Sequence, residues 1–298
     1  MVADQFTPQD PQQQYPGPQE QGEQSQRPPG REREMGPDPD HGEDTYRGTG
    51  RLSGRKAVIT GGDSGIGRAV AIAFAREGAD VLIAHLDEEQ DDADRTVELI
   101  EQAGRSGVAV PGDLRQERDC QVLVERAVRD LGGIDILVNN AAYQMAQDSI
   151  LDITTEQFDR VFKTNIYAMF WLCKAAVPHM RPGAAIINSS SIQSRQPSPE
   201  LLDYAATKAA IVNFTQGLSA QLIGKGIRVN AVAPGPVWTP LIPATMPEEK
   251  VSGFGEQTPI GRAAQPAELA PAYVFLASQE SSYVTGEVLA VTGGQFLT

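Results

Sequence analysis

The chain has 298 residues, 40% of them hydrophobic, which is enough for one large domain or two small ones around a self-sustaining core. A formal net charge of −14 argues against a nucleic-acid partner, and no apolar run approaches a membrane span, so we expect a cytoplasmic protein without a membrane partner. Both cysteines, Cys120 and Cys173, lie in apolar segments, which predicts core thiols in a reducing compartment rather than a disulfide framework.

The first 50 residues differ in composition from the rest of the chain. They contain no Leu or Ile but many Gln, Pro and Gly residues. Such a segment buries too little apolar surface to offset the entropy of ordering it, so we predict that residues 1–50 are a disordered extension and that the folded domain spans 51–298. An alternative is that Tyr46 and Arg47, just before the domain, dock on a neighbouring subunit.

From Arg55 onward, short β-branched runs alternate with longer amphipathic stretches, a pattern typical of βαβ units around a parallel sheet. The predicted strands span residues 57–60, 81–84, 108–110, 134–138, 185–188, 227–233 and 288–291. The predicted helices span residues 66–76, 91–103, 116–131, 155–176, 204–223 and 266–276. The fold class is therefore α/β: a single doubly wound Rossmann-type domain with a seven-stranded parallel sheet and helices on both faces. Its ligand should sit beyond the carboxyl ends of the strands.

The first predicted strand runs directly into a glycine-rich turn that opens a helix. The turn, TGGDSGIG at 60–67, contains Gly61, Gly65 and Gly67. Glycine lets backbone N–H groups approach a ligand closely, and a helix N-terminus adds partial positive charge, so we predict a phosphate site at 65–67. The alternative is a glycine turn that binds nothing, but the strand-turn-helix context favours a phosphate.

Tyr204 and Lys208 lie four residues apart at the start of a predicted helix, so both side chains would lie on one face. A phenol with a pKa of about 10 is a poor base at neutral pH, and a neighbouring ammonium group favours the phenolate. We therefore predict that Lys208 lowers the pKa of Tyr204 and that both residues reach one substrate.

Several motifs, in their order along the chain, resemble those of the short-chain dehydrogenase/reductase family. They are TGGDSGIG at 60–67, NNAA at 139–142, Tyr204-x3-Lys208, and Pro234-Gly235 followed by Thr239. The resemblance covers about residues 52–298. A nearer likeness is to bacterial members with a Pro/Gln-rich N-terminal extension and the loop GGDSGIG, described as aldehyde reductase-like or glucose or ribitol dehydrogenase-like.

The resemblance implies four catalytic residues. Tyr204 would donate a proton to a substrate carbonyl while a nicotinamide delivers hydride, and Lys208 would also bind the nicotinamide ribose. Ser191, at the end of the fifth predicted strand, would orient the reacting oxygen. Three further serines lie close to it, and the family register disfavours them: Ser189, Ser190 and Ser194. Asn165 would hold a water that links the lysine to solvent.

The resemblance also implies a dinucleotide site. Asp113 would hydrogen-bond the adenine ring, and Asn139 with Ala141 would line the adenosine ribose. Thr239 would hold the nicotinamide carboxamide. The complete set of implied cofactor-binding residues is Gly61, Asp63, Ser64, Gly65, Ile66, Gly67, His85, Asp113, Leu114, Asn139, Ala141, Tyr204, Lys208, Pro234, Gly235, Val237 and Thr239.

The end of the second predicted strand bears on the choice between NAD and NADP. An acidic residue there normally accepts hydrogen bonds from the ribose hydroxyls, whereas this chain has His85. An imidazole tolerates or pairs with a 2′-phosphate, which favours NADP(H) slightly over NAD(H). NAD(H) stays open, because Asp63 and Asp87 would repel a phosphate and no Arg stands beside His85.

Residues 236–263 contain five prolines and little helix or strand periodicity, and they match the position of the family's substrate-covering lobe. Candidate substrate residues are Gln144, Gln193 and Trp238. Polar amides combined with one large aromatic ring favour a small polar carbonyl compound or polyol.

The sequence therefore predicts an NAD(P)(H)-dependent oxidoreductase that acts on a small aldehyde, ketone, sugar or polyol. No metal is expected, since the three histidines, His41, His85 and His179, lack ligand spacing. The resemblance implies a homotetramer. Two alternatives remain. A non-catalytic nucleotide-binding scaffold or sensor would not need all four catalytic residues, and a 3-ketoacyl-carrier reductase would need a basic docking patch, which the acidic composition disfavours.

Overall fold

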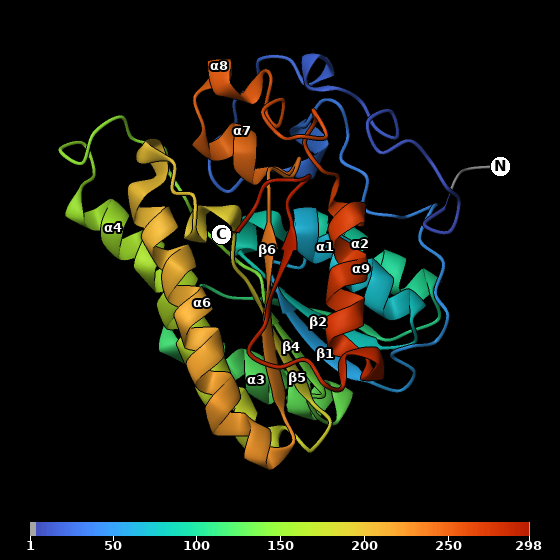
Figure 1. Ribbon diagram of the computed structural model, residues 1–298. Helices are drawn as coiled ribbons and strands as arrows, with labels where there is room; N and C mark the ends of the chain where they lie inside the picture. Colours follow the sequence, from blue (N-terminus) through green and yellow to red (C-terminus); the bar gives the residue numbers. More distant parts are fainter. Residues whose placement is uncertain (1–3, 298) are drawn as a thin grey trace.

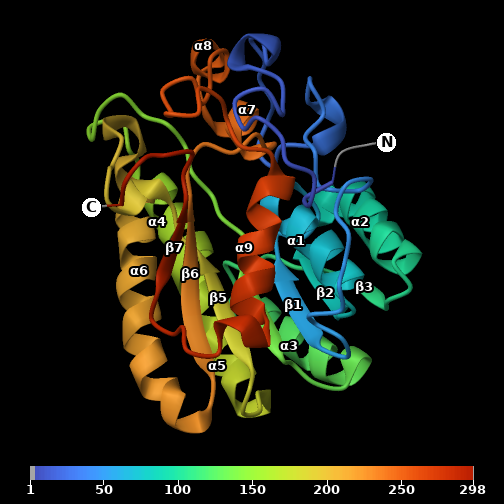
Figure 2. The ribbon, with the colours of Figure 1, turned by 45° about the vertical axis from the view of Figure 1, so that its right-hand side comes forward.

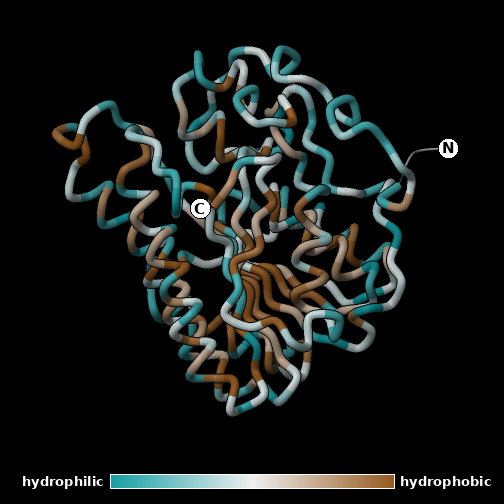
Figure 3. The backbone as a smooth tube through the Cα atoms, in the orientation of Figure 1, coloured by the Kyte–Doolittle hydropathy of each residue, from teal (hydrophilic) through white to brown (hydrophobic). Residues whose placement is uncertain are grey.

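The computed structural model describes residues 4–297, and a parallel sheet of seven strands forms its centre (Figure 1). The strands are β1 (Lys56–Thr60), β2 (Asp80–His85), β3 (Gly107–Pro111), β4 (Ile136–Asn139), β5 (Ala185–Ser189), β6 (Arg228–Pro234) and β7 (Val288–Val291). They lie in the order β3-β2-β1-β4-β5-β6-β7, and every neighbouring pair is parallel. The central strands are strongly apolar (Figure 3), as expected for strands covered on both faces. The predicted parallel seven-stranded sheet is confirmed.

Helices cover both faces of the sheet (Figure 2). One face carries α1 (Gly65–Arg76), α2 (Gln90–Gln102) and α9 (Pro266–Ala277), which share one apolar cluster with the sheet. The opposite face carries α3 (Glu117–Leu131), α5 (Ala168–Ala176) and α6 (Leu202–Leu222), which share a second cluster. Cys120 and Cys173 are buried free thiols in this second cluster, as predicted. The two clusters hold the strand ends at fixed positions.

The helix predicted over 155–176 is divided into three parts. It begins as α4 (Thr155–Phe162), continues as a π-helical turn (Lys163–Tyr167) and ends as α5. The π turn contains Asn165, whose buried side chain hydrogen-bonds Tyr143 and Thr207. A π turn places one extra residue in a helix and occurs frequently at functional sites. The predicted helical stretch is therefore confirmed, with a π turn inside it that the sequence pattern did not indicate.

The chain reverses its direction across the sheet beside β1. From β1 it passes to β2 and β3 on one side, and it then returns to β4 on the other side of β1. The turns that follow β1 and β4 are tied together, because the backbone N–H of Asn140 donates to Thr60 Oγ1 over 2.9 Å. Such a reversal leaves a crevice beyond the carboxyl ends of the strands.

The segment 236–263, called the lobe, lies above these strand ends (Figure 1). It contains two short helices, α7 (Leu241–Thr245) and α8 (Glu248–Val251). Its own small core contains Trp238, Ile242, Val251 and Ala263, and Met35 of the N-terminal extension completes it. The lobe and the extension are therefore packed against each other.

The extension is ordered in the structure, contrary to the prediction for residues 1–50, of which 1–3 lie outside the described part. Within residues 4–50 it contains two 3₁₀ turns, Pro18–Glu20 and Glu32–Glu34, and no longer helix or strand, yet it lies along the domain (Figures 1 and 2). The prediction of disorder considered only how much apolar surface the extension can bury. The extension is held by polar partners on the domain, so it needs little apolar surface of its own. The Tyr46 hydroxyl, for example, donates to the buried Glu77 carboxylate over 2.9 Å, so Tyr46 docks on its own domain and not on a neighbouring subunit.

No helix within residues 4–297 is long and apolar enough to cross a membrane.

Candidate active site

A pocket of about 380 Å³ lies beyond the carboxyl ends of the strands. Most of the predicted site residues line it: Gly61, Asp63, Ser64, Gly65, Ile66, His85, Asp113, Leu114, Ala141, Gln144, Ser191, Gln193, Tyr204, Lys208, Pro234, Gly235, Val237 and Thr239. Four predicted residues lie outside its walls: Gly67, Asn139, Asn165 and Trp238. The fold thus brings together residues that are as much as 178 positions apart, from Gly61 to Thr239.

Gly61 and Gly65 shape the turn between β1 and α1. Both have positive φ, +59° and +49°, a region that side chains rarely adopt. A Cβ on Gly65 would lie 2.9 Å from Thr239 Cγ2, and a Cβ on Gly61 would lie 3.1 Å from Ala141 Cα. Gly67 packs beneath the turn against the Gly61 carbonyl. Apart from the Gly65 N–H, which donates to the Glu32 carboxylate over 2.6 Å, the N-terminus of α1 therefore meets the pocket through bare backbone, which suits a phosphate.

Buried polar atoms without protein partners mark the end of the pocket beside β2. Asp63 Oδ2 and His85 Nε2 are buried and make no hydrogen bond with the described residues. The other ring nitrogen of His85 lies 2.8 Å from the Leu86 carbonyl oxygen. Because unpaired buried polar groups cost free energy, both atoms suit hydroxyl groups of a bound ligand. The residues at this end therefore fit the ribose of a dinucleotide.

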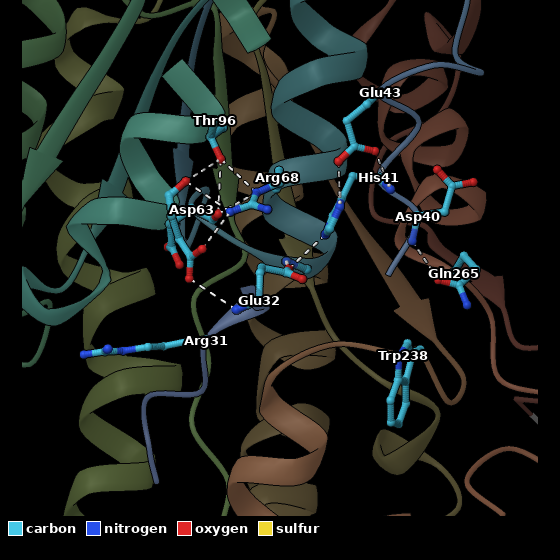
Figure 4. Close-up of polar contacts among 12 residues, drawn as sticks. Arg31, Glu32, Asp40, His41, Glu43, Asp63, Arg68, Thr96, Trp238 and Gln265 are labelled. Atoms are coloured by element: carbon cyan, nitrogen blue, oxygen red, sulfur yellow. Dashed lines mark hydrogen bonds and ion pairs between the residues drawn. The ribbon is translucent and has the colours of Figure 1, made fainter. Parts of the chain in front are cut away.

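Burial controls the charge at this end of the pocket. It raises the pKa of Asp63 to about 6, and burial together with the charge of Asp63 raises the pKa of Glu89 to about 8. The buried Arg68 guanidinium donates to the Asp63 backbone carbonyl over 2.8 Å and to Asp92 Oδ1 over 3.2 Å (Figure 4). At neutral pH, the raised pKa values and the Arg68 guanidinium thus make this end of the pocket less negative than fully ionised Asp63, Glu89 and Asp92 would make it.

Two residues predicted to contact adenosine are held by protein partners. Asp113 accepts hydrogen bonds from Arg115 Nε over 2.8 Å and Nη2 over 2.6 Å, and these bonds lower the pKa of Asp113. Asn139 donates to Asn188 Oδ1 over 2.8 Å and lies outside the pocket, whereas Asn140 lines it. The prediction for Asn139 is therefore corrected by one position, because successive side chains of a strand point to opposite sides.

Tyr204 and Lys208 are buried on one face of α6. The Lys208 Nζ lies 5.2 Å from the centroid of the Tyr204 ring and donates to the Ser189 carbonyl over 2.8 Å. Burial raises the pKa of Tyr204 to about 12, an effect that the Ser191 hydroxyl partly offsets, and burial lowers the pKa of Lys208 to about 7. Burial therefore outweighs the hydrogen bond from Ser191, and the lowering of the Tyr204 pKa by Lys208 stays a prediction.

The serine cluster after β5 divides into structural and pocket-facing members. The Ser189 hydroxyl lies 2.7 Å from the Tyr273 hydroxyl, and the Ser190 hydroxyl donates to the Lys208 carbonyl over 3.0 Å. The Ser191 hydroxyl accepts the Gln193 N–H over 3.1 Å, and it lies close enough to the Tyr204 hydroxyl to lower the pKa of Tyr204. This geometry singles out Ser191 among its neighbours.

Asn165 supports the pocket wall from behind. Its Oδ1 accepts the Tyr143 N–H over 2.8 Å, and its Nδ2 donates to the Tyr143 carbonyl over 2.9 Å and to Thr207 Oγ1 over 3.0 Å. Tyr143 lines the pocket, with the Arg160 guanidinium 3.9 Å from the centroid of its ring. Asn165 therefore fixes the backbone at Tyr143 in this structure.

The wide end of the pocket combines amides with apolar side chains. Gln144 donates to Thr245 Oγ1 over 3.0 Å, and Gln193 accepts the Ser198 N–H over 2.6 Å. Trp238 is fully buried and donates to the Pro37 carbonyl over 2.8 Å, so its predicted place in the substrate pocket is wrong. The lobe core and the extension enclose its ring.

Sequence reasoning missed several lining residues. They are Pro28, Pro29, Gly30, Glu89, Asn140, Tyr143, Leu201, Met246 and Phe254. Most of them belong to irregular segments without a periodic pattern. Asn140 and Tyr143 could have been found, because they directly follow a predicted strand end.

Comparisons with known proteins identify the family of this chain. The family model described as enoyl-(acyl carrier protein) reductase matches residues 61–295. Similar curated proteins include the uncharacterized oxidoreductase YghA of Escherichia coli, 56% identical over 92% of this chain and 94% of its own. The glucose and ribitol dehydrogenase of Daucus carota is 50% identical over 89% of this chain and 93% of its own. Matches of this extent have to include part of the first 50 residues.

A solved structure of a short-chain dehydrogenase from Burkholderia cenocepacia in complex with NADP is 32% identical and superposes with a TM-score of 0.77. It covers 82% of this chain and 98% of its own length, so part of this chain has no counterpart in it. Because the family model and the relatives cover most of the chain, the protein is an NAD(P)-dependent oxidoreductase that belongs to the short-chain dehydrogenase/reductase family.

Proposed function

We propose that the protein transfers hydride between NADP(H) and a small carbonyl or alcohol substrate: an aldehyde, a ketone, a sugar or a polyol. The observation that carries this proposal is the meeting of Ser191, Tyr204 and Lys208 in the pocket that also contains the glycine turn. The mixed wall of Gln144, Gln193 and apolar side chains favours a small, partly polar substrate. The similarity to a plant glucose and ribitol dehydrogenase supports the polyol class.

The chemistry divides between the cofactor and the chain. When bound, the nicotinamide supplies or accepts the hydride. Burial keeps Tyr204 protonated at neutral pH, with its pKa near 12, so its hydroxyl donates a proton to the substrate oxygen during reduction. The Ser191 hydroxyl orients that oxygen by a hydrogen bond. Lys208, with its pKa lowered to about 7, exchanges protons readily near neutral pH, and it would hold the nicotinamide ribose when the cofactor is bound.

The dinucleotide would lie along the strand ends. The backbone of Ser64 and Ile66 at the start of α1 would receive the phosphates, beside the Gly65 N–H that donates to Glu32. Pro234, Gly235, Val237 and Thr239 after β6 would hold the nicotinamide. We favour NADP(H) slightly over NAD(H), because His85 replaces the usual acidic residue and the raised pKa values of Asp63 and Glu89 reduce repulsion of a 2′-phosphate. The similar structure in complex with NADP supports this preference.

The test is turnover of a panel of aldehydes, ketones and polyols with NADPH and NADH in parallel. Tyr204→Phe should lose about 10²- to 10⁴-fold in turnover, because it removes the donated proton. Tyr283→Phe is the matched control, since Tyr283 is fully exposed and remote from the pocket. Wild-type turnover in Tyr204→Phe would contradict the proposed role.

We also propose that the protein is a cytoplasmic homotetramer. The buried free thiols fit a reducing compartment. Phe158, Tyr167 and Phe170, on α4, the π turn and α5, each expose 47% of their surface, and β7 lies at the edge of the sheet. Exposed apolar side chains of this size on neighbouring turns favour contact with a second copy. Light scattering should give about four times the chain mass of 32.0 kDa, and a monomer at micromolar concentration would refute the proposal.

A further inference from the structure

Residues 26–41 of the extension, here called the strap, cross the outer side of the cofactor pocket. Pro28, Pro29 and Gly30 line the same pocket as the glycine turn. Gly30 lies directly against the substrate lobe, because a Cβ placed on it would be 2.3 Å from the Pro240 carbonyl oxygen. The backbone N–H of Gln26 also donates to the Pro243 carbonyl over 2.9 Å. The strap therefore bridges the lobe and the mouth of the pocket.

Glu32 fastens the strap to the glycine turn, and Figure 4 shows its carboxylate beside the ring of His41. Its carboxylate is buried, with only 6% of the residue exposed, and Oε1 accepts the Gly65 N–H over 2.6 Å. The same oxygen lies 2.9 Å from His41 Nε2, while the Glu32 N–H donates to Asp92 Oδ2 over 3.3 Å. One side chain of the extension thus contacts the first residue of α1, where the cofactor phosphates are proposed to bind.

The charge of Glu32 is balanced inside the strap. Burial alone would raise the pKa of Glu32, but the charge of His41 lowers it below its usual value. Burial would likewise lower the pKa of His41, but Glu32 and Glu43 raise it to about 9. His41 is therefore protonated at neutral pH and offsets the carboxylate, which limits its repulsion of a nearby phosphate.

The far end of the strap is fastened independently. The Asp40 carbonyl accepts the Ala267 N–H over 2.9 Å, and the Asp40 N–H donates to Gln265 Oε1 over 2.9 Å. Trp238 holds the Pro37 carbonyl. With both ends fixed, the residues between them are held over the pocket.

We propose that the strap is the outer wall of the cofactor site and that Glu32 is its positioning residue. Glu32 holds the strap against Gly65, so that Pro28, Pro29 and Gly30 cover the bound dinucleotide and slow its release. This inference rests on the proposed placement of the cofactor at the glycine turn. Since Glu32 does not contact the reacting atoms, it acts on cofactor binding and not on hydride transfer.

The experiment measures NADPH release by stopped-flow fluorescence in the full chain. Glu32→Ala removes the fastening, and Gly30→Ala separates the strap from Pro240 without changing any charge. Both variants should release NADPH about tenfold faster than wild type. Glu32→Gln should lie between wild type and Glu32→Ala, because an amide oxygen still accepts the Gly65 N–H but loses the charge pairing with His41.

Two variants in the extension serve as matched controls. Glu34→Ala removes an exposed carboxylate, and Gly17→Ala adds a methyl group where nothing lies closer than 4.0 Å. Both should release NADPH like wild type. NADPH should also slow trypsin cleavage after Arg31 and Arg33 in wild type, and this protection should be lost in Glu32→Ala and Gly30→Ala.

Several outcomes would overturn the inference. Release from Glu32→Ala and Gly30→Ala at the wild-type rate would show that the strap does not retain the cofactor. Slower release from Glu32→Ala would show that the carboxylate competes with the phosphate. If Glu32→Ala does not fold, Glu32→Gln and Gly30→Ala decide alone. A wild-type protein that binds neither NADPH nor NADH would instead refute the proposed function.

Discussion

The two sides of the cofactor pocket are built in different ways. The inner side consists of strand ends and one tight turn, so its residues lie within short runs of sequence such as 60–67. The outer side consists of the strap and the lobe 236–263, which are irregular and more than 190 residues apart in the chain. Regular structure positions groups through backbone geometry, whereas irregular structure needs individual side-chain contacts such as that between Glu32 and Gly65. On the inner side, substitutions that strain the backbone should therefore weaken the site most. On the outer side, substitutions that remove single polar contacts should do so.

The largest expected effect tests the polar contacts of the outer side. The folded pKa of His41, about 9, is above its unfolded value of 6.5, so its stabilisation is complete below pH 6.5 and lost as pH rises through 9. The lost stabilisation amounts to about 3 kcal/mol. The measurement is the free energy of urea unfolding between pH 6 and pH 9.5, in wild type and in His41→Gln.

The difference between these two proteins is the informative quantity, since Glu89 and Lys208 also titrate in this range. The wild-type advantage should shrink steadily as pH rises. A difference that is constant across the whole range would mean that the buried pair of His41 and Glu32 does not contribute in its ionised form.

Backbone strain on the inner side is the next effect in size. Gly65→Ala forces a side chain into a positive φ and against Thr239, at a cost of about 1–3 kcal/mol, so cofactor affinity should fall about 10- to 100-fold. Gly261→Ala is the matched control, because Gly261 also has positive φ but no atom within 4 Å of the added methyl group. Equal affinity in the two variants would contradict the assignment of the phosphate site. Titration of intrinsic fluorescence with NADPH provides the measurement.

A smaller effect concerns cofactor choice and pH. Burial raises the pKa of Asp63 and of Glu89, so both groups gain negative charge as pH rises from 6 to 9. Arg68 and His85 face Asp63, whereas Asp92 and Glu88 face Glu89 and add negative charge there. We expect the affinity for NADPH relative to NADH to fall several-fold over this range. Glu89→Gln should flatten the profile, and a ratio independent of pH in wild type would argue against a 2′-phosphate near these carboxyl groups.

The smallest expected effect lies at the substrate end. Met246→Ala removes part of the apolar wall, so the KM of an apolar aldehyde should rise a few-fold, while that of a short polyol should change little. Met145→Ala is the control, since Met145 does not line the pocket. Equal changes for both substrates would indicate a general disturbance of the lobe.

Sequence reasoning succeeded where a local pattern determines the structure. The strands, the glycine turn and the spacing of Tyr204 and Lys208 all depend on neighbours within a few residues. It failed for Trp238, whose partner Pro37 is 201 positions away, and for the extension, whose order depends on charges on the domain. It did not foresee that burial raises the pKa of Tyr204, because the degree of burial cannot be obtained from residue spacing.

The π turn at Lys163–Tyr167 carries one further consequence. Each residue advances an α-helix by about 100°, so one extra residue rotates everything that follows it relative to what precedes it. The turn therefore lets Asn165 face inward while α4 and α5 keep their own apolar contacts. Removing a single residue here would rotate the side chains of α5 away from their contacts relative to those of α4. The irregular stretch at 145–153 has no helical periodicity that a deletion could disturb. Tolerance of insertions and deletions should thus differ sharply between two segments that lie next to each other in the chain.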